Sequence, residues 1–334
     1  MATIRDVAKL AGVSVSTVSR VLNQNGYVNK ETEQKVVAAI SKLNYEPNAM
    51  ARGLASKKTG TIAIILPDIS NPFFPELARA VEDVARTYGY TVFLCNSDDH
   101  SDKEKSYIDV LHKKYIDGII FASNTLTGSE IERMQKQNTP FVVLDRTPDQ
   151  QSCSIVRSKN YLGGRLAVEH LLEVGCKKIA HIYGPQYFST ARERLMGYED
   201  CVRGYDWFSP SLMIPGDFSM NGGKKAVEIL FQRFSDVDGI FIGNDLMAVG
   251  ALKVLNQKGI KVPDEMAICG FDGISLSEMI EPEITTIAQP IYEMGALATR
   301  ILIKKIQGLE QQNQCYELDV KLVPRESTRR GTNP

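Results

Sequence analysis

The sequence has few of the residues that form covalent cross-links or metal centres. Its 334 residues include six cysteines, four histidines and one tryptophan. No C-x-x-C pair and no H-E-x-x-H occurs, and no histidine lies near a cysteine at ligand spacing. We therefore expect neither a disulfide framework nor a zinc site. Most cysteines lie in or beside apolar runs, which predicts reduced and mostly buried thiols.

Signatures of catalysis and of membrane targeting are also missing. The chain has no P-loop, no G-x-G-x-x-G after an apolar run and no nucleophile elbow. Its carboxylates show no arrangement suited to acid–base work. We therefore expect no catalytic residue and no cofactor. No signal peptide and no membrane span is apparent, so we expect a cytoplasmic protein.

Charge is nearly balanced overall but unevenly placed along the chain. The formal net charge is −1. Residues 1–60 carry nine Lys or Arg against four Asp or Glu, which gives +5, so the remaining residues sum to −6. A basic segment on a mildly acidic body is typical of one phosphate-binding surface. With 43% hydrophobic residues, the chain is long enough for two or three domains.

The first 23 residues are typical of two short helices joined by a turn. In the stretch TIRDVAKLAGVSVSTVSRVLN, Thr3 can cap the first helix, with Asp6 completing a capping box. Gly12 permits a tight turn, and Ser14 can cap the second helix. Helical spacing predicts that the inward residues are Ile4, Val7, Ala8, Ala11, Val18, Val21 and Leu22. Such a unit is a helix-turn-helix.

A helix-turn-helix places the start of its second helix in the DNA major groove. Val15 can contact a thymine methyl group there, and Arg20 can make a bidentate contact to guanine. A two-helix fragment of an ordinary core is the alternative, and this stretch alone does not decide between the two. The residues expected to reach DNA are Thr3, Val15, Ser16, Thr17, Ser19, Arg20 and Asn23.

The following residues favour DNA binding. A third helix is expected over 32–43, with Val36, Val37, Ile40 and Leu43 turned inward. The segment 48–54, NAMARGL, could form two helical turns but is too short to be stable alone. The N-terminal stretch, followed by Y-x-P-N-x-x-A-R-x-L at 45–54, resembles the LacI family of bacterial repressors.

The resemblance implies that 48–54 is a hinge helix, ordered only on DNA. In the family, two such helices lie in the minor groove, and a leucine from each wedges into the central base step. That role falls here on Leu54. The DNA contacts implied in this region are Tyr45, Asn48, Arg52, Leu54 and Ala55.

Beyond residue 59, apolar runs alternate with helical patterns. The strand candidates are 61–66, 91–95, 118–122, 141–145, 178–183, 239–243 and 266–271. Helices are expected near 73–88, 101–114, 129–136, 161–174, 189–202, 221–234 and 245–257. Near-continuous apolar strands with helices between them predict parallel sheets covered on both faces. The predicted fold is an all-α headpiece plus an α/β body of two doubly wound parallel-sheet lobes.

Polar and aromatic side chains follow these runs where each strand should end, which is where such sheets bind ligands. Amides, carboxylates and guanidinium groups pair with adjacent hydroxyls, and aromatic faces pack on sugar rings. Each residue alone could be a helix cap or core, but their recurrence favours a small polyhydroxylated ligand. The candidates are Asn71, Phe73, Phe74, Asn124, Asp145, Arg146, Arg194, Phe218, Asn244, Asp272 and Gln289.

The body is similar to the periplasmic sugar-binding fold that serves as the effector domain of the LacI family. Its strand-end residues are most similar to those of ribose-binding members, in N-P-F-F at 71–74, A-R-E-R at 191–194 and G-F-D-G at 270–273. At Asn124 the local spacing is shifted by one residue. Arg146 stands where purine-sensing relatives have a flat aromatic, which speaks against a nucleobase ligand.

The resemblance also implies a domain plan. It gives a headpiece over 1–46, a hinge and linker over 47–60 and an effector domain over 61–334. One lobe would take about 61–160 and 291–319, and the other about 161–290 and 320–334. The chain would cross between lobes near 158–163, 289–292 and 318–322. The resemblance implies that two subunits pair side by side and bind a near-palindromic operator. It also allows a phosphocarrier protein as a further co-regulator.

We therefore predict a dimeric repressor that is cytoplasmic and associated with the nucleoid. A small sugar is expected to lower its operator affinity, and D-ribose is the preferred candidate. Another pentose, a small hexose or a sugar phosphate are alternative effectors, and co-repression is an alternative sign. An enzyme, such as a sugar kinase or an aldolase-like protein, and a transport binding protein are rival functions. The missing catalytic motifs oppose the first, and the headpiece opposes the second.

Overall fold

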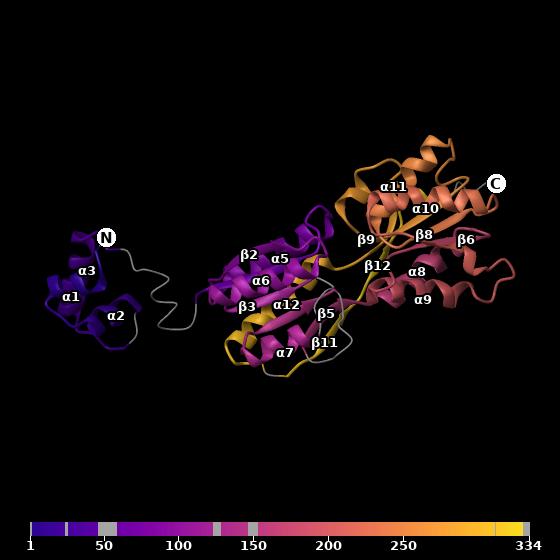
Figure 1. The fold of residues 1–334 in the computed structure, drawn as a ribbon. Helices are drawn as coiled ribbons and strands as arrows, with labels where there is room; N and C mark the ends of the chain where they lie inside the picture. Colours follow the sequence, from indigo (N-terminus) through magenta and orange to yellow (C-terminus); the bar gives the residue numbers. More distant parts are fainter. Residues whose placement is uncertain are drawn as a thin grey trace. The chain divides into compact units, whose positions relative to one another are not determined.

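The computed structural model describes residues 2–23, 26–45, 59–122, 128–145, 153–310 and 312–329. The chain divides into two compact units, Met1–Gly60 and Thr61–Pro334 (Figure 1). Six of the predicted binding residues lie outside the described residues: Asn48, Arg52, Leu54, Ala55, Asn124 and Arg146.

The described residues of the N-terminal unit form three helices, α1 (Ile4–Ala11), α2 (Val15–Asn23) and α3 (Lys30–Lys42). Thr3 caps α1: its hydroxyl accepts from the Asp6 backbone N–H, and the Asp6 carboxylate accepts from the Thr3 N–H at 2.8 Å. The predicted capping box is therefore confirmed. Gly12 ends α1 with φ of 66°, a left-handed conformation that favours glycine. The Ser14 hydroxyl accepts from Thr17 N–H at 3.1 Å, as predicted for the cap of α2.

The headpiece core is small and apolar. Its buried residues are Val7, Ala8, Val18, Val36 and Ala39. The inward prediction for Val37 is wrong, because its side chain is 51% exposed and Ala39 lies on the buried face instead. Helical spacing aligns 36, 39, 40 and 43 on the inner face of α3. Position 37 falls outside that face and is turned to solvent.

The larger unit contains two six-stranded sheets (Figure 1). The first has the order β11-β5-β4-β3-β1-β2, and all its strand pairs are parallel. Its strands are β1 (Thr61–Leu66), β2 (Thr91–Asn96), β3 (Gly118–Phe121), β4 (Phe141–Leu144), β5 (Ser154–Ser158) and β11 (Cys315–Leu318).

Helices cover both faces of the first sheet because its central strands are apolar on both sides. Alternate residues of β1, such as Ile62 and Ile64, pack against α5 (Phe73–Thr87) and α12 (Ile291–Ile306). Ala63 and Ile65 face the other side, against α6 (Ser101–Lys113) and α7 (Gly128–Lys136). This double coverage is the reason that the strands are nearly continuous apolar runs.

The second sheet has the order β12-β10-β9-β8-β6-β7. Its strands are β6 (Ile179–Tyr183), β7 (Met213–Pro215), β8 (Gly239–Ile242), β9 (Ala267–Asp272), β10 (Thr285–Ala288) and β12 (Lys321–Val323). They pair in parallel except at the edge, where β12 runs antiparallel to β10. Three short 3-10 helices lie at Pro210–Leu212, Ser275–Glu278 and Glu326–Thr328.

The second sheet is also covered on both faces. Ile182 and Ile240 pack with α10 (Met220–Arg233) and α11 (Asp245–Gln257). Phe241 and Cys269 face α8 (Asn160–Glu173) and α9 (Ser189–Val202). The predicted class, an all-α headpiece with an α/β body of two doubly wound sheets, is confirmed.

The chain passes between the two sheets three times. It leaves the first sheet after β5, returns after β10 to form α12, and leaves again between β11 and β12. Strands β5, β7, β10, β11 and β12 lie outside the apolar runs expected from the sequence. In the part of the chain that the structure describes, no helix is both long and apolar enough to cross a membrane.

Candidate functional site

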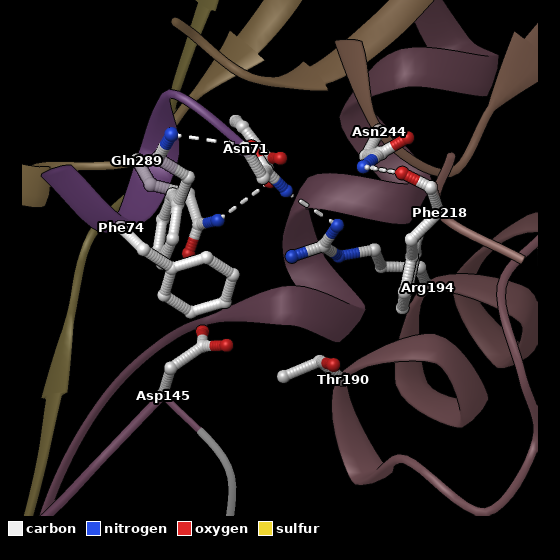
Figure 2. A pocket seen from close by; sticks show the side chains of 10 residues that line it. Asn71, Phe74, Asp145, Thr190, Arg194, Phe218, Asn244 and Gln289 are labelled. Carbon is white, nitrogen blue, oxygen red and sulfur yellow. Dashed lines mark hydrogen bonds and ion pairs between the residues drawn. The ribbon is translucent and has the colours of Figure 1, made fainter. Parts of the chain in front are cut away.

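A pocket lies at the carboxyl ends of the strands in the larger unit. Figure 2 shows side chains from both sheets pointing into it. The residues that line it are Asn71, Phe73, Phe74, Asp145, Thr190, Arg194, Phe218, Asn244, Asp272 and Gln289. The structure thus brings together all nine of the predicted pocket residues that it describes.

Thr190 was not predicted. It lies in the first turn of α9, four residues before Arg194, so both side chains lie on one face of the helix. Reading the A-R-E-R motif one helical turn upstream would have suggested it. A hydroxyl at this position adds a donor and acceptor to a wall that otherwise carries the guanidinium.

The first lobe supplies aromatic rings and one carboxylate. Phe73 and Phe74 open α5, and their rings meet edge to face at a centroid distance of 5.1 Å. The Asn71 Oδ1 accepts from Phe73 N–H at 3.2 Å, which fixes the amide beside the helix start. Asp145 follows β4, and its backbone N–H donates to Val156 O at 2.8 Å.

Arg194 occupies the second lobe's wall and is only 4% exposed. Its Nε donates to Asn160 Oδ1 at 2.8 Å, and its Nη1 donates to Gly243 O at 2.6 Å. Nη1 also lies 3.3 Å from Asp272 Oδ1. The guanidinium carbon lies 3.6 Å from the centre of the Phe271 ring. These contacts fix the guanidinium before any ligand arrives.

Asp272 and Gln289 form a hydrogen-bonded pair beside Arg194. Gln289 Nε2 donates to Asp272 Oδ1 at 2.8 Å, and Gln289 Oε1 accepts from the Ser158 hydroxyl. Burial raises the pKa of Asp272 to about 6, and the Arg194 guanidinium opposes this rise. The pair links the end of β9 to the points where the chain passes between the sheets.

Asn244 fixes the remaining side of the pocket. Its Oδ1 caps α11 by accepting from Met247 N–H at 2.9 Å, while its Nδ2 donates to Phe218 O at 3.1 Å. The Phe218 ring stacks on Phe188 at an interplanar angle of 6°. The capping interaction explains why an asparagine stands at the strand end, and it also orients the amide.

Three lining residues have a positive φ that favours glycine: Asp145 at 64°, Phe218 at 65° and Asp272 at 114°. Such conformations cost free energy in residues with a Cβ, and they persist where the surrounding structure holds them. Their concentration around one pocket indicates a site built for ligand geometry. The lining offers carboxylates, amides, a hydroxyl, a guanidinium and aromatic faces, which together can bind a ring bearing several hydroxyl groups.

The predicted DNA-contacting side chains lie mostly on the surface of the headpiece. Val15 is 41% exposed although apolar, and Ser16 and Arg20 are exposed beside it. Thr17 and Ser19 are half-buried, and the Thr17 hydroxyl lies 2.8 Å from that of Ser14.

The other predicted contacts in this unit lie at its margins. Thr3 is exposed at the start of α1, and Asn23 is the last residue of α2. Tyr45 packs half-buried against the headpiece core. Val15 and Arg20 give α2 an exposed apolar residue and an exposed cation five residues further along, the kinds of side chain that a groove-reading helix uses.

Among the described residues, no group of three or more His, Cys, Asp or Glu could hold a metal ion. All six cysteines are free, and four of them are buried.

Two family profiles match the chain. The profile of the lacI family of bacterial regulatory proteins matches residues 3–48. The profile described as periplasmic binding proteins and sugar binding domain of the LacI family matches residues 59–326. The second match covers most of the larger unit, including every lining residue of the pocket.

Individual proteins agree with the profiles. The ribose operon repressor of Halalkalibacterium halodurans is 47% identical over 333 residues, covering 100% of this chain and 99% of that protein. A ribose-bound LacI family regulator from Enterococcus faecium has a TM-score of 0.73 and 33% identity, covering 80% of this chain and 98% of that structure. The lac repressor dimer on operator has a TM-score of 0.85 and 28% identity, covering 98% and 99%. Members of this family are transcriptional regulators, and the chain belongs to the LacI family of bacterial regulatory proteins.

Proposed function

We propose that this protein is a repressor whose affinity for operator DNA falls when D-ribose occupies the pocket at the strand ends. The observation that carries the proposal is the pocket itself, in which buried amide, carboxylate and guanidinium groups converge from both lobes beside three phenylalanine rings. The name of the 47%-identical relative and the ribose bound in the Enterococcus structure support the choice of sugar.

The described part of the pocket favours a neutral sugar over a sugar phosphate. Two carboxylates, Asp145 and Asp272, line it and repel an added anion. Arg194 has already committed its Nε and Nη1 to protein acceptors. A fork around a phosphate group needs parallel N–H groups on two nitrogens, so a guanidinium with Nε and Nη1 already bonded is poorly placed to form one.

We also propose how the sequence divides into working parts. Residues 1–46 would read the major groove through Val15, Ser16 and Arg20, and residues 47–60 would provide the hinge with Leu54 as wedge. Residues 61–334 would bind the sugar and pair two subunits side by side. We propose no catalytic activity, a cytoplasmic and nucleoid-associated protein, and a near-palindromic operator. A phosphocarrier protein as co-regulator stays a prediction of the family resemblance.

The direct experiment is a calorimetric titration of the purified protein with D-ribose, ribose 5-phosphate, other pentoses, hexoses and purines. We expect ribose to bind most tightly and the phosphate to bind least among the pentose compounds. Tight binding of a purine, or of the phosphate in place of ribose, would contradict the proposal. A time course with ribose, ATP and magnesium should show no turnover, and product formation would revive the enzyme alternative.

A further inference from the structure

Asp245 is a fully buried carboxylate that does not line the pocket. It is the first residue of α11, directly after Asn244. Its Oδ2 accepts from the backbone N–H of Gly273 at 2.8 Å and of Ile274 at 3.0 Å. Its Oδ1 lies 2.6 Å from the Thr286 hydroxyl. A helix beside the pocket thus binds the backbone that follows β9.

The backbone bound by Asp245 is the turn that presents Asp272. Asp272 has φ of 114°, where an L residue is strained, and Gly273 follows at 78°. Without an external partner, two consecutive residues at positive φ would cost free energy and leave the next two amides pointing at a buried space. The Asp245 carboxylate satisfies both amides and so stabilises the strained turn.

The surroundings leave space for this one side chain. A Cβ at Gly270 would lie 2.3 Å from Asp245 Oδ1, so glycine at that position keeps the cavity for the carboxylate. Burial, followed by the neighbouring Asp272 charge, raises the pKa of Asp245 to about 8. The Thr286 hydroxyl donates to Oδ1 and the two amides donate to Oδ2, so both oxygens of the buried side chain have partners.

The turn places the Asp272 carboxylate among the groups that would bind a sugar. Asp272 Oδ1 lies within hydrogen-bond distance of Gln289 Nε2 and Arg194 Nη1. A rotation of the 272–273 peptide would move the carboxylate away from both. The Asp245 carboxylate accepts from the N–H of that peptide on the side away from the pocket, so it can fix the peptide without contacting a ligand.

We propose that Asp245 is a positioning residue for effector binding, which holds the turn after β9 so that the Asp272 carboxylate faces the ligand. The inference rests on the proposed sugar site and adds a residue outside it. It predicts that removing the Asp245 side chain weakens ribose binding although ribose never contacts this residue.

The test compares Asp245→Ala with a matched control in the same lobe. Asp238 is a carboxylate that accepts from two consecutive backbone N–H groups, those of Lys177 and Lys178, remote from the pocket lining. By calorimetry with D-ribose, Asp245→Ala should lose about tenfold or more in affinity, the size expected for one or two unsatisfied buried groups. Asp238→Ala should keep its ribose affinity, even if its melting temperature falls as much as that of Asp245→Ala.

Two conservative variants separate positioning from general destabilisation. Asp245→Asn keeps a carbonyl oxygen for both amides and should restore most of the ribose affinity. Thr286→Val removes only the hydroxyl partner and should give a smaller loss of the same kind in a protein that still folds. Unchanged ribose affinity in both Asp245→Ala and Thr286→Val, or an equal loss in Asp238→Ala, would overturn the proposal.

Amide hydrogen exchange gives a readout that needs no sugar. Asp245→Ala should speed exchange at Gly273 and Ile274, and Asp238→Ala should speed it at Lys177 and Lys178 instead. If the unaltered protein binds no sugar, the proposed function fails, and the exchange data still decide whether Asp245 holds the turn. Unaltered exchange at 273 and 274 in Asp245→Ala would refute that role.

Discussion

The headpiece and the pocket handle polar side chains in opposite ways. In the described part of the headpiece every buried residue of the core is apolar, and the candidate contact residues Ser16 and Arg20 are exposed to solvent. The pocket buries its polar groups, with Asn71, Arg194 and Asp272 each less than 10% exposed. The headpiece would therefore bind through charges that solvent ions screen, whereas the pocket would bind through groups fixed before the ligand arrives. Changes in solution or sequence should separate these two modes.

The largest difference between operator binding and ribose binding should appear when the salt concentration is changed. Operator affinity should fall about a thousandfold or more between about 50 and 200 mM salt, because lysine and arginine contacts release counterions from phosphates. Ribose affinity should change little over the same range, since its partners are buried. Filter binding for operator and calorimetry for ribose measure the two. Equal salt dependence would contradict the contrast between the two surfaces.

A substitution in the pocket should affect ribose binding and leave operator binding unchanged. Asp272→Ala leaves Gln289 Nε2 and a sugar hydroxyl without an acceptor, a loss of several kcal/mol that should reduce ribose affinity about a hundredfold or more. The variant should still bind operator and no longer respond to ribose. The exposed Asp264→Ala is the matched control and should behave as the unaltered protein. Loss of operator binding in Asp272→Ala would show that the fold has failed.

A substitution in the headpiece should affect operator binding and leave ribose binding unchanged. Arg20→Ala should lose about 1–3 kcal/mol of operator affinity and relax preference at one base pair in each half-site. Lys42→Ala removes an exposed cation from the last turn of α3 and should cost less, without altering sequence preference. If Arg20→Ala weakened binding to all sequences equally, Arg20 would be a phosphate contact.

Coupling between the two regions should be smaller than either binding energy. Ribose should lower operator affinity about five- to 150-fold, the usual range for such coupling, and operator must then lower ribose affinity by the same factor. Titrating ribose with and without operator measures that factor. Tighter ribose binding on the DNA complex would indicate co-repression.

The smallest effect should be that of pH on the pocket. With its pKa near 6, Asp272 is mostly ionised at pH 7 and mostly protonated at pH 5. A sugar hydroxyl that donates to the carboxylate stabilises the ionised form, so ribose affinity should fall about tenfold from pH 7 to pH 5. The groups that act on this carboxylate are Arg194, Asp145 and Asp245. Asp272→Asn should flatten the profile, and an unchanged slope in that variant would assign the titration to another group.

The sequence predicted the fold well where helices and strands are long or buried on both sides. Runs such as 61–66 and helices such as 189–202 coincide with β1 and α9. The strands that it did not predict are short, polar or at an edge. β7 has three residues, β11 is exposed or half-buried along its length, and β5 contains buried Ser154 and Arg157. Such segments are stabilised as strands by pairing with a neighbouring strand. Local hydrophobic periodicity carries no information about that pairing.

The pocket was predictable for a similar reason. Parallel strands bring their carboxyl ends to one edge, so the residues after each run could be grouped without knowing the fold in detail. Thr190 was not predicted because it reaches the pocket from a helix and follows no strand. Asp245 does follow β8, directly after Asn244, but its carboxylate binds the turn after Asp272 and does not line the pocket, which the sequence alone does not reveal. Val37 was misplaced because the helical phase of α3 could not be fixed from apolar residues alone.

The three passages of the chain between the sheets also determine the order in which the protein can be completed during synthesis. The headpiece emerges from the ribosome before the two sheets and has its own small core. The first sheet must wait for α12, which covers one of its faces, and for its edge strand β11, both from the last 50 residues of the chain. Throughout most of translation a folded headpiece would therefore precede an unfinished sensor. Premature termination near residue 290 should leave an intact DNA-reading unit with no finished first lobe to regulate it.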